Sequence, residues 1–151
     1  MNITGKPSNY PYTLEDLLRL TVEKGGSDLH LVAGIPPCIR INGDLIRQEM
    51  PNLLPEDVEV MLFSMMTEEQ KESFLEEWEL DLALSVPQCA RFRGNVIVQR
   101  STLAAVFRAI PFEVPELEKL GLPPDVKRLC NLPRGLVLVT GPTGSGKSTT
   151  L

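Results

Sequence analysis

The sequence predicts an α/β fold in which a small mixed domain of helices and strands precedes the first strand of a parallel sheet. Three observations support this prediction. Apolar residues recur at helical spacing in some segments and alternate with polar residues in others. Prolines crowd residues 111–124, which indicates a semi-rigid linker. Residues 136–140 (LVLVT) then form a continuous apolar run, the pattern of a strand that is buried on both faces of a parallel sheet.

The composition is that of a globular protein, with 42% hydrophobic and 23% charged residues in 151. The net charge of −5 argues against a general nucleic-acid binder, because phosphate contacts need a local surplus of Lys and Arg. No apolar stretch approaches the roughly 18 residues of a membrane span, and no signal peptide is evident. We therefore expect a cytoplasmic protein with no membrane insertion. Its three cysteines lack metal or disulfide spacing and are interpreted as reduced thiols.

The beginning of the small domain is predicted from a cap and an alternating segment. Residues 1–12 have little apolar surface to bury and are predicted to be a flexible tail. A helix follows, because Thr13 and Asp16 form a capping pattern ahead of apolar residues at helical spacing. Residues 27–33 alternate as a half-buried strand, on which Asp28 and His30 face away from the apolar side. With no second histidine or paired cysteine, His30 is interpreted as a strand-surface residue rather than a metal ligand.

The middle of the small domain is predicted to hold a hairpin and two helices. Asn42-Gly43 suits a tight type I′ turn between two short strands, because both residues tolerate positive φ. Helices are then predicted over residues 55–66 and from Thr67 to about Trp78. The second helix carries many glutamates, which are interpreted as its solvated face and not as catalytic carboxylates.

Three longer strands complete the small domain, over residues 80–86, 90–99 and 103–110. A tight hairpin turn between the last two strands places Arg93 directly opposite Arg108 on the outer face of the sheet. Like charges in such a position destabilise a sheet. Two interpretations follow: either both arginines are solvated, or an anion such as phosphate lies between them.

Residues 141–148 (GPTGSGKS) match GxxxxGK[ST], the P-loop pattern that cradles nucleotide phosphates. Glycines let successive backbone N–H groups point at phosphate oxygens. Lys147 is predicted to reach the β- and γ-phosphates as the catalytic residue, and the Ser148 hydroxyl to bind Mg²⁺. ATP and Mg²⁺ are the predicted cofactors. The predicted nucleotide-binding residues of the loop are Gly141, Pro142, Thr143, Gly144, Ser145, Gly146, Lys147, Ser148 and Thr149.

Together these segments carry a resemblance to a known family. Five stretches occur in the family's order: SDLHL at 27–31, PPCIRINGDL at 36–45, ARFR at 90–93, VFRAIP at 106–111 and PRGLVLVTGPTGSGKSTTL at 133–151. They resemble the secretion ATPases of type IV pili, and among these the twitching-motility retraction ATPases. The resemblance implies a PAS-like domain at 13–110, a linker at 111–124 and the start of a RecA-like ATPase domain at 125–151.

The resemblance also implies function and partners. It implies a homohexamer at the inner membrane, at the base of the pilus, that acts with the inner-membrane platform protein of the type IV pilus. It implies that Arg93 and Arg108, with Arg100 as a third candidate, reach over the nucleotide. The family's general-base segment, Walker B strand and His box would follow Leu151. We therefore expect the amino-terminal part of a motor, inactive by itself, with a P-loop that is poorly ordered without neighbouring strands.

Other readings of the sequence remain open. Extension ATPases and type II secretion ATPases share the motifs, but usually carry a long extra domain ahead of the PAS-like one. A reading of another class is a PAS-like interaction module whose P-loop is inert. Protection of the backbone amides of residues 141–148 by Mg-ATP would discriminate between the ATPase and that module. A P-loop kinase or GTPase is disfavoured. Such proteins carry the P-loop near the start of their chain, whereas here 140 residues precede it.

Overall fold

The computed structural model describes residues 8–110, 117–123, 125–142 and 145–150. The chain divides into two compact units, Met1–Phe112 and Glu113–Leu151, and each is described by itself. Within these described ranges, no helix combines the length and the apolar character that crossing a membrane requires.

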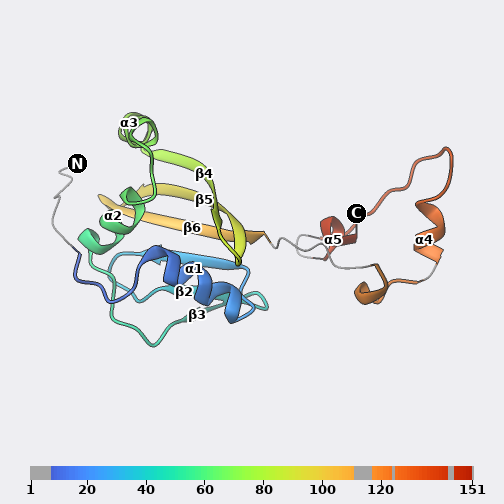
Figure 1. The fold of residues 1–151 in the computed structure, drawn as a ribbon, viewed down its shortest axis with the longest axis horizontal. Coiled ribbons are helices and arrows are strands. Elements are labelled where there is room, and N and C mark those ends of the chain that lie inside the picture. The colour runs from blue at the N-terminus through green and yellow to red at the C-terminus, as the bar shows by residue number, and fades with distance from the viewer. Residues whose placement is uncertain (1–7, 111–116, 124, 143–144, 151) are drawn as a thin grey trace. The chain divides into compact units, whose positions relative to one another are not determined.

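In residues 8–110 the first unit forms a six-stranded antiparallel sheet with three helices packed against one face (Figure 1). The strands lie in the order β3-β2-β1-β6-β5-β4. The strands are β1 Asp28–Val32, β2 Cys38–Ile41, β3 Asp44–Arg47, β4 Glu79–Val86, β5 Ala90–Gln99 and β6 Thr102–Ile110. The helices are α1 Leu14–Glu23, α2 Pro55–Phe63 and α3 Glu68–Glu77. The predicted mixed α/β class is confirmed.

Side-chain caps start α1 and α3 as the sequence predicts. The Asp16 backbone N–H donates to Thr13 Oγ1 at 3.2 Å, and the Thr13 N–H donates to Asp16 Oδ2 at 2.8 Å. Thr67 and Gln70 form the same reciprocal pair at the start of α3. The predicted length of α2 is wrong, because this helix ends at Phe63 rather than residue 66. The chain must leave α2 there to reach the extended backbone of the cap at Thr67.

Two tight turns set the register of the hairpins. Asn42 and Gly43 both have positive φ, at 51° and 94°, as a type I′ turn requires. Arg100 and Ser101 do likewise between β5 and β6. The resulting register pairs Arg93 with Arg108, which confirms that prediction.

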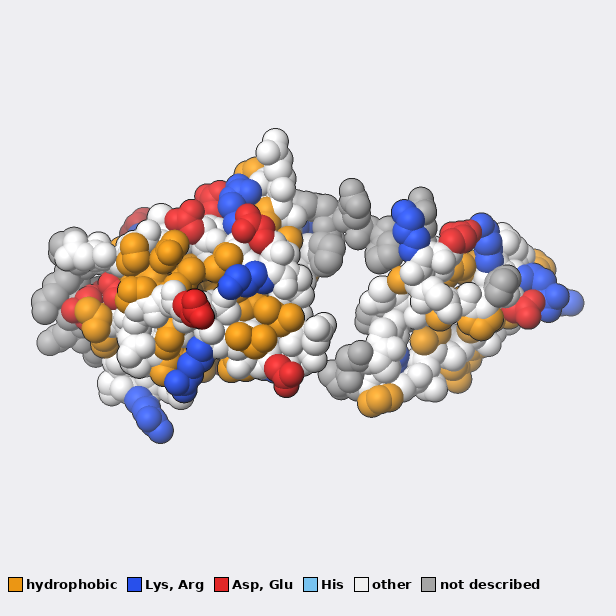
Figure 2. All heavy atoms as spheres, turned by 90° about the horizontal axis from the view of Figure 1, so that it is seen from below, with side chains coloured by type: hydrophobic (Ala, Val, Ile, Leu, Met, Phe, Trp, Pro, Cys, Tyr) orange, Lys and Arg blue, Asp and Glu red, His pale blue; other side chains and the backbone are white. Residues whose placement is uncertain are grey.

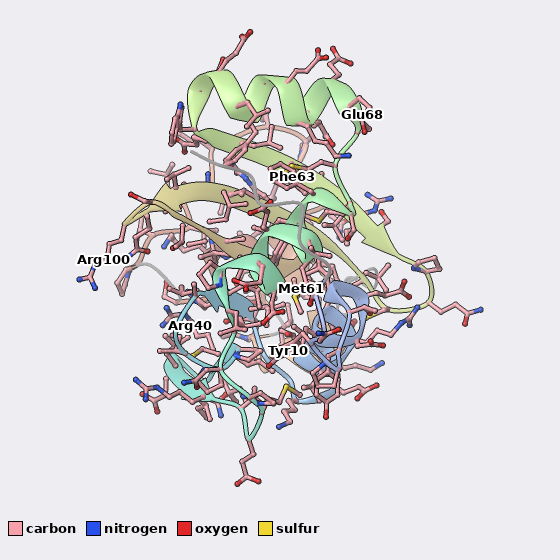
Figure 3. All side chains as sticks on the ribbon, turned by 90° about the vertical axis from the view of Figure 1, so that its left-hand side faces the viewer. Tyr10, Arg40, Met61, Phe63, Glu68 and Arg100 are labelled. Carbon is pink, nitrogen blue, oxygen red and sulfur yellow. The ribbon has the colours of Figure 1, made fainter. Side chains whose placement is uncertain are left out.

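The core lies between the helices and one face of the sheet. Leu29 of β1, Phe92 of β5 and Phe107 of β6 have no exposed surface, and they pack in one cluster with buried side chains of α1 and α2. Figure 3 shows Met61 of α2 among the side chains beneath the helices. Within residues 8–110, no helix covers the opposite face of the sheet, so β1, β5 and β6 present an open surface.

The predicted tail needs a correction where it is described. The Ser8 hydroxyl donates to Asp57 Oδ1 at 2.8 Å, and the Tyr10 hydroxyl donates to the Pro51 carbonyl at 2.8 Å. Burial, together with the negative charge of Asp57, raises the pKa of Tyr10 to about 12. These contacts attach Ser8 and Tyr10 to the domain. Residues 1–7, where the same prediction was made, lie outside the described residues.

The second unit contains a 3-10 turn at Leu117–Leu120 and two short helices, α4 Asp125–Leu129 and α5 Lys147–Thr150. The predicted strand at residues 136–140 is wrong for this structure, because the described residues after 116 contain no strand. Leu136 is 82% exposed and Leu138 is 74% exposed. A parallel strand forms only by pairing with neighbours, and no paired strand lies beside this segment within the described part of the unit. The assignments to a linker and a RecA-like domain stay predictions.

Candidate functional site

In the described part of the P-loop segment, the residues on either side of the gap at 143–144 approach one another. Gly141 has φ 155° and Gly146 has φ 84°, a backbone region that favours glycine. A Cβ atom on Gly141 would lie 2.6 Å from Ser145 Oγ, so a larger residue there would require the Ser145 side chain to move. This lack of space fits a loop in which backbone N–H groups approach phosphate oxygens directly.

Lys147 begins α5 and turns its side chain back over the loop. Its Nζ donates to the carbonyl oxygens of Gly141 at 2.8 Å and Pro142 at 2.6 Å. The ammonium group therefore lies over the same turn that the glycines form. It can exchange these neutral carbonyls for charged phosphate oxygens, which make stronger hydrogen bonds.

Some predicted residues of the loop cannot be placed. Thr143 and Gly144 lie outside the described residues, as does the side chain of Ser148, the predicted Mg²⁺ ligand. Thr149 is exposed in α5. Within the described residues, no group of three or more His, Cys, Asp or Glu side chains could hold a metal ion. The Mg²⁺ site therefore stays a prediction.

A second candidate site lies on the open face of the sheet in the first unit. Four charged residues are direct cross-strand neighbours along one row, which runs Arg40, Asp28, Arg108 and Arg93 over β2, β1, β6 and β5. Directly opposed residues place their side chains on the same face. The row therefore carries three positive charges and one negative charge in a protein whose net charge is −5.

Asp28 is the buried member of this row. Its Oδ1 accepts from Arg108 Nε at 2.9 Å, and its Oδ2 accepts from the Ser27 hydroxyl at 2.7 Å. Arg40 Nε lies 3.5 Å from the same Oδ2. Burial acts to raise the pKa of Asp28, but hydrogen bonds from Ser27 and Arg108 and the charge of Arg108 outweigh it. The pKa consequently lies below its usual value, and Asp28 is a carboxylate at neutral pH.

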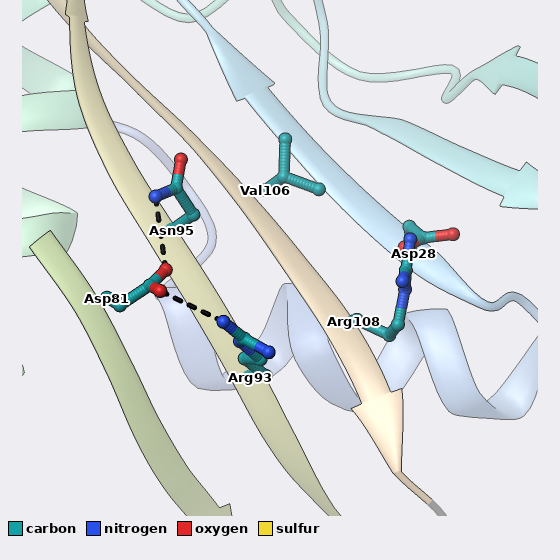
Figure 4. Close-up of a pocket in the computed structure, with 6 residues that line it drawn as sticks. All are labelled: Asp28, Asp81, Arg93, Asn95, Val106 and Arg108. Carbon is teal, nitrogen blue, oxygen red and sulfur yellow. Dashed lines mark hydrogen bonds and ion pairs between the residues drawn. The ribbon is translucent and has the colours of Figure 1, made fainter. Parts of the chain in front are cut away.

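Arg93 is held differently, by an exposed partner. Its NH2 group donates to Asp81 Oδ2 at 3.0 Å, and Asn95 donates to Asp81 Oδ1 at 3.1 Å. These hydrogen bonds lower the pKa of Asp81. Figure 4 shows the two ion pairs around an open pocket of about 230 Å³, which Val106 also lines.

The structure brings two of the three candidate arginines together. Arg93 and Arg108 line one pocket, whereas Arg100 lies at the turn between β5 and β6. Arg100 lies seven positions after Arg93, which in an extended strand is a span of about 23 Å. Figure 3 shows the Arg100 side chain at the edge of the molecule, pointing outward.

Sequence reasoning missed the carboxylates that hold these arginines. It placed Asp28 on the outer face of its strand, where a charged residue is ordinarily exposed, yet this side chain is buried. A strand-surface carboxylate was visible in the sequence, but its arginine partner is 80 residues away. Only the pairing of β1 with β6 brings the two side chains together.

Comparison with known proteins gives consistent matches. The family described as Type II/IV secretion system protein matches residues 79–151. The chain is 47% identical over 138 residues to the type IV pilus retractation ATPase PilT of Pseudomonas aeruginosa, which is 91% of this chain and 40% of that protein. It is 42% identical over 137 residues to the type IV pilus ATPase PilU of the same organism, which is 91% of this chain and 36% of that protein.

Solved structures agree with these matches. A crystal structure of the pilus retraction motor PilT with bound ADP superposes with a TM-score of 0.77 at 44% identity, covering 92% of this chain and 41% of that one. The ATPase DotB of Legionella pneumophila superposes with a TM-score of 0.79 at 22% identity, covering 96% of this chain and 42% of that one, which supports the fold alone. The chain thus spans about two fifths of the length of these relatives. The matched length extends over both units, and along 91% of its residues the chain is similar to the pilus retraction ATPase, with the secretion system family model matching residues 79–151.

Proposed function

We propose that the chain is the ATP-binding portion of a motor ATPase that powers retraction of type IV pili. The observation that carries this proposal is the 47% identity to a retraction ATPase along 91% of the chain, which includes a complete P-loop sequence. The activity is hydrolysis of ATP, coupled to the disassembly of the pilus.

In this proposal Lys147 compensates the charge of the β- and γ-phosphates, and Ser148 binds Mg²⁺ through its hydroxyl. The remaining loop residues, from Gly141 to Thr149, surround the phosphates, and all of them except Pro142 supply a backbone N–H group. The tight closure at Gly141 and the position of the Lys147 ammonium over the loop support these roles. ADP bound to the related PilT structure also supports a nucleotide site.

Arg93 and Arg108 are proposed as sensors of the terminal phosphate. Both lie on the open sheet face with side chains about 70% exposed, at 70% and 72%, and their guanidinium groups suit phosphate oxygens. Contact between these arginines and the nucleotide would couple ATP binding to movement between the small domain and the ATPase domain.

The working form is proposed to be a homohexamer in the cytoplasm, at the inner-membrane base of the pilus, acting on the platform protein there. Apolar residues left on the open sheet face support an interface between subunits. Ile97 is 36% exposed and Ile110 is 47% exposed among the charged residues of that face.

Two alternatives have some support. The first is a type II secretion or pilus-extension motor, because the putative type II secretion system protein E of Escherichia coli is 40% identical over 90 residues. That match covers 48% of this chain, so retraction is the better-supported function. The second alternative is an interaction module with an inert P-loop, which the exposure of Leu136 and Leu138 favours for the 151-residue chain by itself.

The test replaces the P-loop lysine in the full-length protein. Lys147→Ala removes the ammonium group that balances phosphate charge, so both ATP hydrolysis and twitching motility should be lost while the small domain stays folded. The matched control is Lys127→Ala on α4, which loses only an exposed ion pair with Glu118 and should retain activity. Unchanged ATP turnover in Lys147→Ala would overturn the proposal.

A further inference from the structure

Asp28 lies between two arginines of neighbouring strands, and hydrogen bonds hold its carboxylate. Arg40 precedes it and Arg108 follows it in the cross-strand row. Both of its carboxylate oxygens are engaged, Oδ1 by Arg108 and Oδ2 by Ser27, and its side chain is only 5% exposed. A buried carboxylate on a strand with neighbours on both sides has little freedom to move, so it can hold the Arg108 side chain in one position.

The hydrogen bond from Arg108 uses one particular atom. Nε lies at the inner end of the guanidinium group, so its bond to Asp28 leaves the terminal nitrogens at the outer end of a side chain that is 72% exposed. Two N–H groups side by side are the arrangement that takes two phosphate oxygens at once. Asp28 therefore fixes the direction of Arg108 without occupying the groups that a phosphate would need.

Arg93 shows the opposite arrangement one strand away. It donates through a terminal nitrogen, NH2, to Asp81, whose side chain is 57% exposed. Exposed ion pairs of this kind contribute little to stability and exchange readily. Asp81 therefore occupies one of the groups that a phosphate would take, and the phosphate would have to displace it.

We propose that Asp28 is a positioning residue, which holds Arg108 by its inner edge so that the terminal nitrogens face a phosphate of a nucleoside triphosphate. Asp81, in contrast, is a displaceable counter-ion of Arg93. This inference deepens the proposed function, and it rests on the role as phosphate sensors given there to Arg93 and Arg108. Replacement of Asp28 should consequently weaken the binding of a nucleoside triphosphate, whereas replacement of Asp81 should not.

The experiment measures affinity in the full-length protein for ADP and for a non-hydrolysable ATP analogue. Asp28→Asn keeps the shape and one acceptor oxygen but removes the charge that anchors Arg108. It should weaken the ATP analogue about tenfold, the size expected for one charged hydrogen bond, and change ADP by less than about twofold. Asp81→Asn should bind the ATP analogue as tightly as the wild type or more tightly. Equal weakening of both nucleotides by Asp28→Asn, or weakening of the ATP analogue by Asp81→Asn, would overturn the inference.

The variant Arg108→Ala distinguishes the sensor role of Arg108 from the positioning role of Asp28. If Arg108→Ala selectively weakens the ATP analogue and Asp28→Asn does not, the sensor stands and the positioning role is wrong. If Arg108→Ala has no selective effect, the sensor role fails and the positioning role fails with it. In the double variant, Asp28→Asn should add nothing to Arg108→Ala, because its effect acts through that side chain.

A measurement on the wild-type protein covers the case in which Asp28→Asn does not fold. Nitrogen-15 NMR should show slower hydrogen exchange at Arg108 Nε, which donates to a buried carboxylate, than at Arg93 Nε. Equal exchange rates at the two Nε atoms would show that Asp28 does not hold Arg108 in solution, and would overturn the inference.

Discussion

His30 is a residue whose environment favours its neutral form. It lies on β1, and its Nε2 atom is buried without a hydrogen-bond partner among the described residues. Burial and the positive charge of Arg40 lower the pKa of His30 from its ordinary value of 6.5; Asp28 opposes the shift and Arg108 adds to it. A second proton would place an unpaired N–H⁺ beside two arginines. The sequence predicts that His30 is a strand-surface residue, but in the structure it is half-buried.

This environment predicts a loss of stability in mild acid. The folded pKa is lower than the unfolded one, so the contribution to stability is complete above pH 6.5 and declines as the pH falls toward the folded pKa. The melting temperature should fall between about pH 7 and pH 5.5, a range in which histidine is the side chain that ordinarily titrates. Because the sequence has one histidine, His30→Leu should remove this dependence. A wild-type melting temperature that is constant over this range would contradict the assignment.

The two sensor arginines give a second prediction at this scale. Arg108→Ala and Arg93→Ala in the full-length protein should each weaken ATP much more than ADP, or lower turnover at saturating ATP. Arg108→Lys should restore only part of the loss, because a lysine keeps the charge but lacks the planar, two-pronged guanidinium. Arg91→Ala is the matched control on the same strand, since Arg91 does not line the pocket. Variants of Arg93 and Arg108 with unchanged ATP kinetics would leave both arginines as solvated surface residues.

At the scale of elements, β5 depends on a glycine that faces the core. A Cβ atom on Gly94 would lie 2.6 Å and 2.8 Å from ring atoms of Phe107, which is fully buried and has no room to move. Gly94→Ala should therefore lower the free energy of unfolding by about 1–3 kcal/mol, the usual result of overpacking a core. Urea unfolding measures this change. Ser85→Ala on the exposed face of β4 is the control and should stay within about 0.5 kcal/mol of the wild type.

Much of the element structure follows from local sequence signals. The cap at Thr13, the turn at Asn42-Gly43 and the alternation in β5 each depend on residues close together in the chain, and each is confirmed. The neighbours of β1 do not follow from such signals, because β1 pairs with β6 more than 70 residues later. Residues 136–140 have the apolar character of a strand, but that character alone forms no strand without a partner to pair with.

In the candidate site, too, the features that depend on nearby residues could be predicted from the sequence, and those that depend on distant strand pairing could not. The opposition of Arg93 and Arg108 could be predicted, because one short turn fixes the register of β5 against β6. The roles of Asp28 and Asp81 could not, because each depends on which strand lies alongside. The P-loop is recognisable from residue types and spacing alone, since its chemistry depends on the backbone of consecutive residues.

At the scale of the whole molecule, the open sheet face predicts assembly. Ile97 and Ile110 stay partly exposed on this face. Seen from below, the first unit also has hydrophobic side chains between charged ones on its surface (Figure 2). The full-length protein with Mg-ATP should sediment as a hexamer. Ile97→Glu should shift it to smaller species, whereas Leu75→Glu, which changes a residue of similar exposure on α3, should not. A persistent monomer at high protein concentration would contradict the ring.

The exposed apolar run at residues 136–138 gives the last prediction. Leu136, Val137 and Leu138 are 82%, 53% and 74% exposed, which is far more apolar surface than a folded strand leaves open. In the 151-residue chain the amides of residues 136–140 should exchange as fast as those of an unstructured peptide. In the full-length protein they should be strongly protected, because neighbouring parallel strands then pair on both sides, and Mg-ATP should further slow exchange at residues 141–148. Fast exchange at residues 136–140 in the full-length protein would contradict the assignment of this segment to the central sheet of an ATPase domain.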